Sequence, residues 1–168
     1  MGAGVDFSKN IDGQWDKIRA TIQHQMASRS YRAANELRNA SQLVLRGQRS
    51  GRRYTVPGTG RMKYNKRKHT ATITYTKYTA SAPGEPPAVR TGVFRMSWMP
   101  KSYVKSNSST NFSVISSVES TARTDNGKYL LGEILENGTG RMAPRPHHQE
   151  IQKKALPQIM KIYNEPYF

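Results

Sequence analysis

The first part of the chain carries an apolar stripe with the period of an α-helix. Its members recur mostly at steps of three or four residues, with Ser30 as the polar gap, which keeps them on one helix face. The stripe consists of Ile11, Trp15, Ile18, Ile22, Met26, Ala33, Leu37, Ala40 and Val44. No Gly or Pro lies between residues 14 and 46, and Gly47 supplies a stop. The pattern predicts one long helix, or two with a bend near residues 28–30, whose apolar face forms core.

A basic tract follows this helix. From Leu37 to Gly84 the chain has no Asp or Glu, although many of its Lys and Arg lie there. The middle of the tract, residues 47–70, is rich in Gly and has few apolar anchors, which is typical of an exposed loop or a long hairpin. Its cations are the candidate contacts to DNA or to a neighbouring subunit: Arg49, Arg52, Arg53, Arg61, Lys63, Lys66, Arg67 and Lys68.

The charge of the whole chain points the same way. There are 27 Lys and Arg against 11 Asp and Glu, a formal net charge of +16. Such an excess favours nucleic acid or an acidic protein as a partner. The mean hydropathy of −0.78 indicates one compact core with exposed polar excursions. The lack of Cys excludes disulfides and thiolate chemistry. No apolar run approaches the roughly 20 residues of a membrane helix, so we expect no membrane partner.

Three segments alternate with a period of two and are predicted to be strands. Residues 71–76 place Ala71, Ile73 and Tyr75 on one face and threonines on the other. Residues 93–99 alternate in the same way before Pro100 ends the run, and their apolar members Phe94, Met96 and Trp98 are expected to lie in the core. Residues 112–118 form the third strand, and residues 105–110 and 119–127 are polar turns.

Two helices complete the predicted fold. Residues 129–136 form a short helix, and the last helix starts after Pro146 with Ile151, Ala155, Ile159 and Ile162 or Tyr163 on its apolar face. Pro157 is expected to kink or break that helix. Helices around a small antiparallel sheet with an extended basic hairpin or loop make an α+β fold, and we expect one domain over residues 1–168.

Patterns typical of catalysis, metal binding or cofactor binding do not stand out. His147, His148 and Glu150 lie close together, but metal ligands on a helix face stand three or four residues apart. The repeated sequence Gly-Thr-Gly-Arg, at residues 58–61 and 138–141, matches neither the P-loop nor the dinucleotide fingerprint and is best interpreted as two glycine turns. The carboxylates are dispersed. We therefore expect no enzyme, no cofactor and no metal site.

A proline-rich linker covers residues 80–92, with the sequence Ala-Ser-Ala-Pro-Gly-Glu-Pro-Pro-Ala-Val-Arg-Thr-Gly. Its prolines fix φ and its glycines permit positive φ, so it can be well defined without regular structure. This rigidity suggests a subunit contact, with Pro83, Gly84, Glu85, Pro86, Pro87 and Arg90 as candidate assembly residues. The linker resembles a signature of the neck, or tail-completion, proteins of long-tailed bacteriophages, in which an acidic residue usually stands where this chain has Arg90.

A second block, residues 129–146, is similar to another part of the same family. It contains a helical segment, a Gly138-Thr139 turn and a Met-x-x-Arg-Pro approach to the last helix at residues 142–146. The family usually has aromatic residues where this chain has Asn137 and His147. Residues 49–54 are similar to a Gly-Arg-x-Tyr element that usually precedes the linker directly, whereas here residues 55–79 lengthen the connection. The matching order of elements covers nearly the whole chain.

The resemblance implies a structural virion protein that forms a homo-oligomeric ring, of six or twelve copies, at the junction of head and tail. Its implied partners are the portal, adaptor or head-closure proteins on one side and the tail-terminator or tail-tube proteins on the other, with genomic DNA in the channel. It would be assembled in the host cytoplasm and reside in the virion neck.

Two other interpretations stay open. One is the adjacent ring that terminates the tail tube, which shares the size and the α+β character. The other is a sequence-nonspecific nucleic-acid-binding protein that uses the basic tract as its phosphate-binding surface. Salt distinguishes them, because phosphate-driven binding falls steeply with salt whereas an assembled protein ring should persist.

Overall fold

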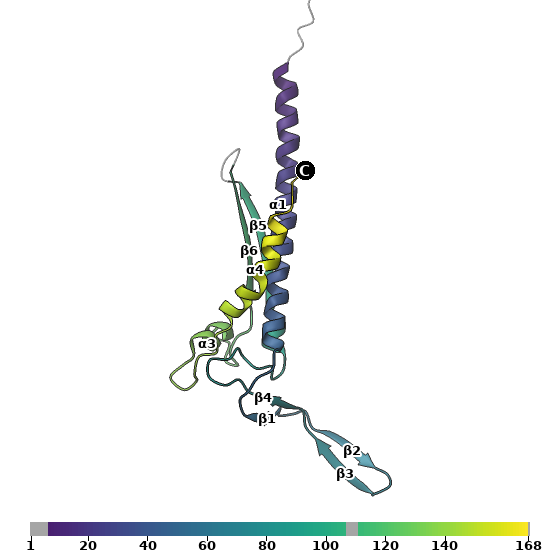
Figure 1. The fold of residues 1–168 in the computed structure, drawn as a ribbon. Helices are drawn as coiled ribbons and strands as arrows, with labels where there is room; N and C mark the ends of the chain where they lie inside the picture. Colours follow the sequence, from purple (N-terminus) through teal and green to yellow (C-terminus); the bar gives the residue numbers. More distant parts are fainter. Residues whose placement is uncertain (1–6, 107–110, 168) are drawn as a thin grey trace, which may run out of the picture.

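A computed structural model describes residues 7–106 and 111–167, and one long helix dominates it (Figure 1). This helix, α1 (Phe7–Arg46), has 40 residues, which corresponds to a length of about 60 Å at 1.5 Å per residue. It is a single element, so of the two alternatives from the sequence the one long helix is confirmed. Its C-terminal half carries the body of the molecule, while its N-terminal half projects beyond it.

The body consists of elements that lie alongside the C-terminal half of α1. Strands β5 (Trp98–Ser106) and β6 (Phe112–Ser120) form an antiparallel hairpin with Tyr103 opposite Ile115. Helix α4 (His148–Tyr163) packs against α1 from the other end of the sequence. The buried part of α1 is lined by small side chains, which let the neighbouring backbones approach closely. These are Ser30, Ala33, Ala34, Ala40 and Ser41.

The apolar core lies where α1, β5 and α4 meet. Ala40 and Leu45 of α1, Trp98 of β5, and Ile151 and Ala155 of α4 are all buried together. Partly buried side chains pack around this cluster: Leu37, Val44, Phe94, Val118 and Ile159. The predicted apolar faces of α4 and of the C-terminal half of α1 are therefore confirmed as core.

A buried polar contact nearer the middle of α1 joins this helix to β6 and α4. The Ser30 hydroxyl donates to the Ile115 carbonyl at 2.8 Å, and the Ser116 hydroxyl donates to the Ser30 carbonyl at 3.0 Å. The Ser116 and Tyr163 hydroxyls lie 2.8 Å apart. Because these groups satisfy one another, they can be buried without the cost of an unpaired polar atom.

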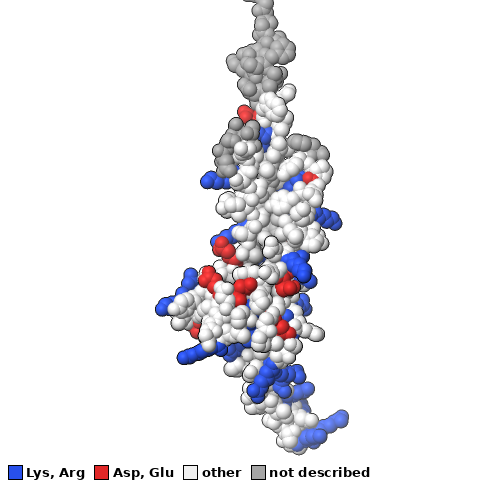
Figure 2. Space-filling view, turned by 60° about the vertical axis from the view of Figure 1, so that its left-hand side comes forward, with Lys and Arg blue, Asp and Glu red and all other residues white. Residues whose placement is uncertain are grey.

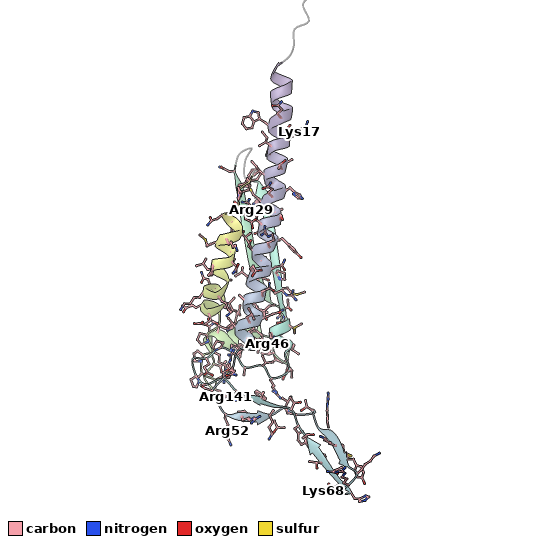
Figure 3. All side chains as sticks on the ribbon, turned by 45° about the vertical axis from the view of Figure 1, so that its right-hand side comes forward. Lys17, Arg29, Arg46, Arg52, Lys68 and Arg141 are labelled. Carbon is pink, nitrogen blue, oxygen red and sulfur yellow. The ribbon has the colours of Figure 1, made fainter. Side chains whose placement is uncertain are left out.

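The chain end is held on α1 by two arginines. Arg29 is buried and donates to the Pro166 carbonyl at 2.7 Å, and its guanidinium lies 3.8 Å from the centre of the Tyr167 ring. Arg32 forms two hydrogen bonds of 2.6 Å with the Glu165 carboxylate. Figure 3 places Arg29 beside the C-terminal end of α4.

One predicted strand is partly wrong. Residues Val93–Met96 form a short helix, α2, and β5 begins only at Trp98. Gly92 precedes α2 with φ of 86°, and the Ser97 hydroxyl donates to the Phe94 carbonyl, so the chain turns before it extends. Met96 is exposed, which corrects its assignment to the core, whereas Phe94 and Trp98 do pack there.

Pro100 does not end the strand as predicted, since β5 continues through it and pairs Pro100 with Val118. In an antiparallel pair every second residue makes no ladder bond to its partner strand, so a two-stranded sheet tolerates a proline. Lys105, Glu119 and Ser120 also belong to the hairpin rather than to turns. Part of the turn predicted over residues 105–110 lies outside the described residues.

The predicted helices near the C-terminus are present as α3 (Leu131–Asn137) and α4. Pro157 does not break α4, which continues to Tyr163. The proline lies on the exposed side of the helix, and burial of Ile151, Ala155 and Ile162 on the other side stabilises the turn despite the missing hydrogen bond. Within the described ranges, no helix has the length and apolar character that crossing a bilayer requires.

The remaining strands form an arm, residues 52–79, that extends from the end of α1 away from the body (Figure 1). Strands β1 (Arg53–Thr55) and β4 (Lys77–Thr79) pair at its base, and β2 (Arg61–Asn65) and β3 (Thr70–Thr74) pair in its outer part. The predicted α+β class, with a long N-terminal helix, small antiparallel sheets and a C-terminal helix, is confirmed.

Candidate assembly surfaces and nucleic-acid interface

The arm consists of two short ribbons joined by an ordered bend. At the bend, the Val56 N–H donates to the Thr76 carbonyl at 2.8 Å. The Thr59 hydroxyl donates to the Val56 carbonyl at 2.7 Å and accepts the Thr76 N–H at 3.0 Å. Gly58 has φ of 73°, a conformation that glycine adopts without a steric penalty. The outer ribbon is therefore held at a defined angle rather than on a loose tether.

The two faces of the outer ribbon differ in chemistry. The register pairs Met62 with Ile73 and Tyr64 with Ala71, so these side chains share one apolar face. Arg61 pairs with Thr74 and Lys63 with Thr72, which places cations and threonines on the opposite face. Every residue from Arg61 to Lys77 is exposed, including Met62 at 73% and Ile73 at 53%.

Most of the predicted basic contact residues lie along this arm. Arg52 and Arg53 stand at its base, Arg61 and Lys63 on the basic face of the outer ribbon, and Lys66, Arg67 and Lys68 at its tip. Figure 3 shows Lys68 at the outer end and Arg52 near the body. The tip turn is organised by the Asn65 side chain, which accepts the backbone N–H groups of Arg67 and Lys68. The structure thus brings seven of the eight candidates onto one projection.

Arg49 is the exception, since it is half-buried against the proline-rich linker. Its guanidinium donates to the Val44 carbonyl at 2.7 Å and to the Pro87 carbonyl at 3.2 Å. Burial lowers the pKa of Arg49, an effect that the nearby Glu85 carboxylate partly offsets. Arg49 joins the end of α1 to the linker, whereas the sequence alone placed it in the exposed basic loop.

The linker itself is fixed by hydrogen bonds within the chain. Glu85 accepts the Ser50 hydroxyl at 2.6 Å, the Ser50 N–H at 3.1 Å and the Ala82 N–H at 2.9 Å. These bonds, led by that of the Ser50 hydroxyl, lower the pKa of Glu85 to about 2. The Ser81 hydroxyl donates to the Pro86 carbonyl at 2.7 Å. The linker is rigid because its own Glu85 and Ser81 side chains bind its backbone and Ser50 binds it from beyond the end of α1, in addition to its proline content.

The linker also contacts the second sequence block that the family resemblance singled out. Arg145 donates to the Ser81 carbonyl at 2.7 Å, and the Gly84 N–H donates to the Pro144 carbonyl at 3.2 Å. Together with α2 and α3, the linker lines an open groove of about 780 Å³. Its apolar lining includes Leu45, Val89, Phe94, Leu131, Leu135 and Met142. Arg90 is exposed at this groove, and Pro83 and Gly84 lie on the outer surface.

A cluster of Glu136, His147 and His148 was not predicted from the sequence, which grouped the histidines with Glu150. The three ligand atoms lie within 4.8 Å of one another. Glu136, however, accepts the backbone N–H groups of His147 at 2.8 Å and His148 at 3.3 Å, so it caps the start of α4. The residue at the N-cap, His147, makes no side-chain cap bond, so α4 needs such an acceptor from elsewhere.

His147 is a buried side chain at the start of α4. Its Nδ1 lies 3.0 Å from the Arg145 carbonyl and 2.8 Å from the Glu136 carboxylate, so it carries the proton. Its ring packs edge-on against Phe94 and Trp98. Burial lowers the pKa of His147, although the Arg145 carbonyl and Glu136 act in the opposite direction. The cluster therefore holds α4 in place and resembles a structural contact more than a metal site.

The N-terminal half of α1 carries part of the predicted apolar stripe, but other elements of the chain do not fully bury these side chains. Trp15 is 64% exposed and Ile18 is 39% exposed, while Ile22 and Met26 are half-buried. The prediction that the whole stripe forms core is wrong at Trp15 and Ile18 because the strands and α4 do not reach the start of the helix (Figure 1). Ile11 lies in a stretch whose side chains are outside the description.

Comparison of the chain with protein-family models, with curated proteins and with solved structures finds no match in any of the three.

Proposed function

We propose that the chain is a structural subunit of a long-tailed phage, a component of the ring at the neck where the tail joins the head. The observation that carries the proposal is that two elements project from opposite ends of the body with uncovered apolar side chains. The N-terminal half of α1 exposes Trp15 and Ile18, and the arm exposes Met62, Tyr64 and Ile73. Large apolar side chains gathered on projecting elements are typical of surfaces that a partner covers.

The position of these surfaces favours a ring. Two different surfaces at opposite ends of one subunit make head-to-tail contacts between copies, and such contacts close into a ring when the rotation permits. Contacts of this kind leave both faces of the ring free for other proteins. In the proposed setting these are the portal, adaptor or head-closure proteins on the head side and tail-terminator or tail-tube proteins on the other.

The two sequence blocks that resemble neck proteins support the proposal as a unit. The linker and residues 129–146 are separate segments of the chain, yet they bind each other through Arg145, which donates to the Ser81 carbonyl, and Gly84, which donates to the Pro144 carbonyl. Their contact gives the linker, α3 and the Gly138–Gly140 turn a common structural role at one end of the body. A motif pair of this kind is expected when both parts shape the same assembly surface.

A particle-assembly experiment tests the proposal. In a phage whose copy of this gene is interrupted, we expect filled heads and free tails to accumulate, since the junction between them is missing. Adding the purified chain to such an extract should restore joined, infectious particles. A variant with Trp15→Ser and Ile18→Ser keeps the buried body and should fail to restore them. Joined and infectious particles without the chain would refute the proposal.

A further inference from the structure

The arm concentrates the positive charge of the molecule. Residues 52–79 contain no Asp or Glu, and their cations supply half of the net charge of +16. These cations are Arg52, Arg53, Arg61, Lys63, Lys66, Arg67, Lys68 and Lys77. In Figure 2 the blue side chains reach the far end of the arm, whereas the red ones gather on the body. Acidic residues neutralise much of the positive charge of the body, whereas the arm has no acidic residue to neutralise its own.

The charges of the outer ribbon are also free of partners. Within the described ranges, none of the side chains of Arg61, Lys63, Lys66, Arg67 and Lys68 forms an ion pair. On the body, by contrast, Arg32 pairs with Glu165 and Lys101 with Glu119. Five like charges on an exposed ribbon repel one another, so an external counter-charge would stabilise the arm.

We propose that the basic face and tip of the arm bind the phosphate backbone of double-stranded nucleic acid without sequence specificity. The biological setting of this inference rests on the proposed function, because a ring at the neck would surround DNA. The binding itself is a property of the purified chain, so the two proposals can fail separately.

The geometry of the ribbon suits a duplex. A two-stranded β-ribbon fits the major groove of B-DNA, which is about 12 Å wide. The five residues of β2 span about 17 Å, a length over which Arg61, Lys63 and the tip can reach several phosphates. Thr70 and Thr72 on the same face add hydroxyl donors, which commonly bind phosphate oxygens, whereas the Thr74 hydroxyl donates to the Arg61 carbonyl within the ribbon. The ordered bend at Thr59 presents this face at a fixed angle.

Two observations favour a duplex over the other possible partners. A second copy of this chain also carries a net charge of +16 and would repel the basic face of the arm, although it can still cover the apolar face. Single-stranded nucleic acid is bound mainly by stacking of bases on aromatic rings next to the cations. In the arm, Tyr64 lies on the apolar face, opposite Arg61 and Lys63, and its hydroxyl lies 3.3 Å from His69 Nδ1. The basic face therefore offers charge and hydroxyls rather than a stacking platform.

The proposal predicts a specific salt dependence. If five cations each neutralise one phosphate, the logarithm of the binding constant falls with the logarithm of salt concentration with a slope of about −4.5. The affinity should then fall about 500-fold between 50 and 200 mM salt.

The test is the binding of the full chain to a short fluorescent DNA duplex of mixed sequence, measured by anisotropy. The arm variant changes Arg61, Lys63, Lys66, Arg67 and Lys68 to Gln. The matched control changes five exposed body cations to Gln, which removes the same net charge: Lys128, Arg141, Lys153, Lys154 and Lys161. We expect the arm variant to lose about 100-fold or more in affinity at low salt and most of the slope, and the control to lose about threefold. Equal losses in the two variants, or no duplex binding by the wild-type chain, would overturn the proposal.

A third variant separates the faces of the ribbon. Met62→Thr together with Ile73→Thr keeps every cation and β-forming residues in both strands, and duplex binding should stay within about twofold of the wild type. Loss of binding in this variant, while its far-ultraviolet circular dichroism is unchanged, would assign the contact to the apolar face and overturn the proposal. A single strand that binds more tightly than the duplex, with the difference abolished by Tyr64→Thr, would also contradict it.

Discussion

The C-terminal half of α1 and the arm both display regularly spaced apolar side chains, but only the first has neighbours to cover them. Along residues 29–46 the helix meets β5, β6 and α4, and Ala33, Ala34 and Leu45 are buried. Along the arm, Met62 and Ile73 point into open solvent from a ribbon of two strands. A two-stranded ribbon alone is marginally stable in water. The body is therefore stabilised by contacts within the chain, whereas the apolar face of the arm is left uncovered.

The same contrast holds for charge. Carboxylates of the body accept specific partners, as Glu85 does from Ser50 and Ala82, and Glu136 from the start of α4. The arm contains no carboxylate with which its cations could pair. Under the proposal, the body supplies the folding stability of the chain and the arm supplies a binding surface.

Trp98→Ala should have the largest effect, because Trp98 fills the centre of the core between α1 and α4. Removing a buried aromatic side chain costs about 3–5 kcal/mol of unfolding free energy. Urea unfolding followed by circular dichroism measures the change. A loss below about 1 kcal/mol would show that the core does not stabilise the body as described.

Ala33→Leu should cost about 1–3 kcal/mol of unfolding free energy, because a longer side chain has no room on the fully buried side of α1. Ala27→Leu, at an exposed position of the same helix, serves as the control and should change stability by no more than about 0.5 kcal/mol. Equal effects at the two positions would contradict the close packing of α1 against the body.

His147→Phe should change how stability depends on pH. Burial lowers the pKa of His147 below that of the unfolded chain, so the unfolded state binds the proton first and the native state is destabilised as pH falls below about 6.5. Above that pH this destabilisation is absent. A phenylalanine ring at this position does not titrate, so it would remove the destabilisation and keep the packing on Phe94 and Trp98. Thermal unfolding at a series of pH values measures the difference, with His24→Phe at an exposed position of α1 as the control. An unchanged acid profile in the His147 variant would show that the ring is not held neutral.

Met62→Ala and Ile73→Ala should have the smallest effects, within about 0.5 kcal/mol of unfolding free energy. Both side chains are exposed in the isolated chain and bury little area on folding. The same urea experiment measures them. A loss approaching that of Trp98→Ala would mean that the apolar face of the arm is covered within the chain, and the comparison between arm and body would fail.

The parts of the fold set by periodicity were predictable from the sequence. Helical spacing located α1 and the face of α4 that carries Ile151 and Ala155, and alternation located β3 and β6. Local chemistry overrode the pattern at residues 93–96, where Gly92 and the Ser97 cap turn an alternating segment into a short helix. Pro157 and Pro100 also fit into regular elements because their neighbours supply the packing and pairing.

The sequence predicted which residues the candidate surfaces contain, but not how these residues are arranged in space. The charge of the arm follows from the sequence, but the separation of its faces depends on the register that pairs Met62 with Ile73. The inward position of Arg49 and the cap that Glu136 gives to α4 arise from contacts between distant segments. The local signal was the residue type at the N-cap of α4: His147 makes no side-chain cap bond, so the first N–H groups of α4 need a hydrogen-bond acceptor from another segment.

The most direct test of the account is cryo-electron microscopy of the intact particle at the junction of head and tail. We predict a closed ring of this chain there, with the N-terminal half of α1 covered by a neighbouring protein and the basic faces of the arms turned toward the DNA. A junction built without this chain, or a ring in which Trp15 remains in solvent and the arms point away from the DNA, would contradict it.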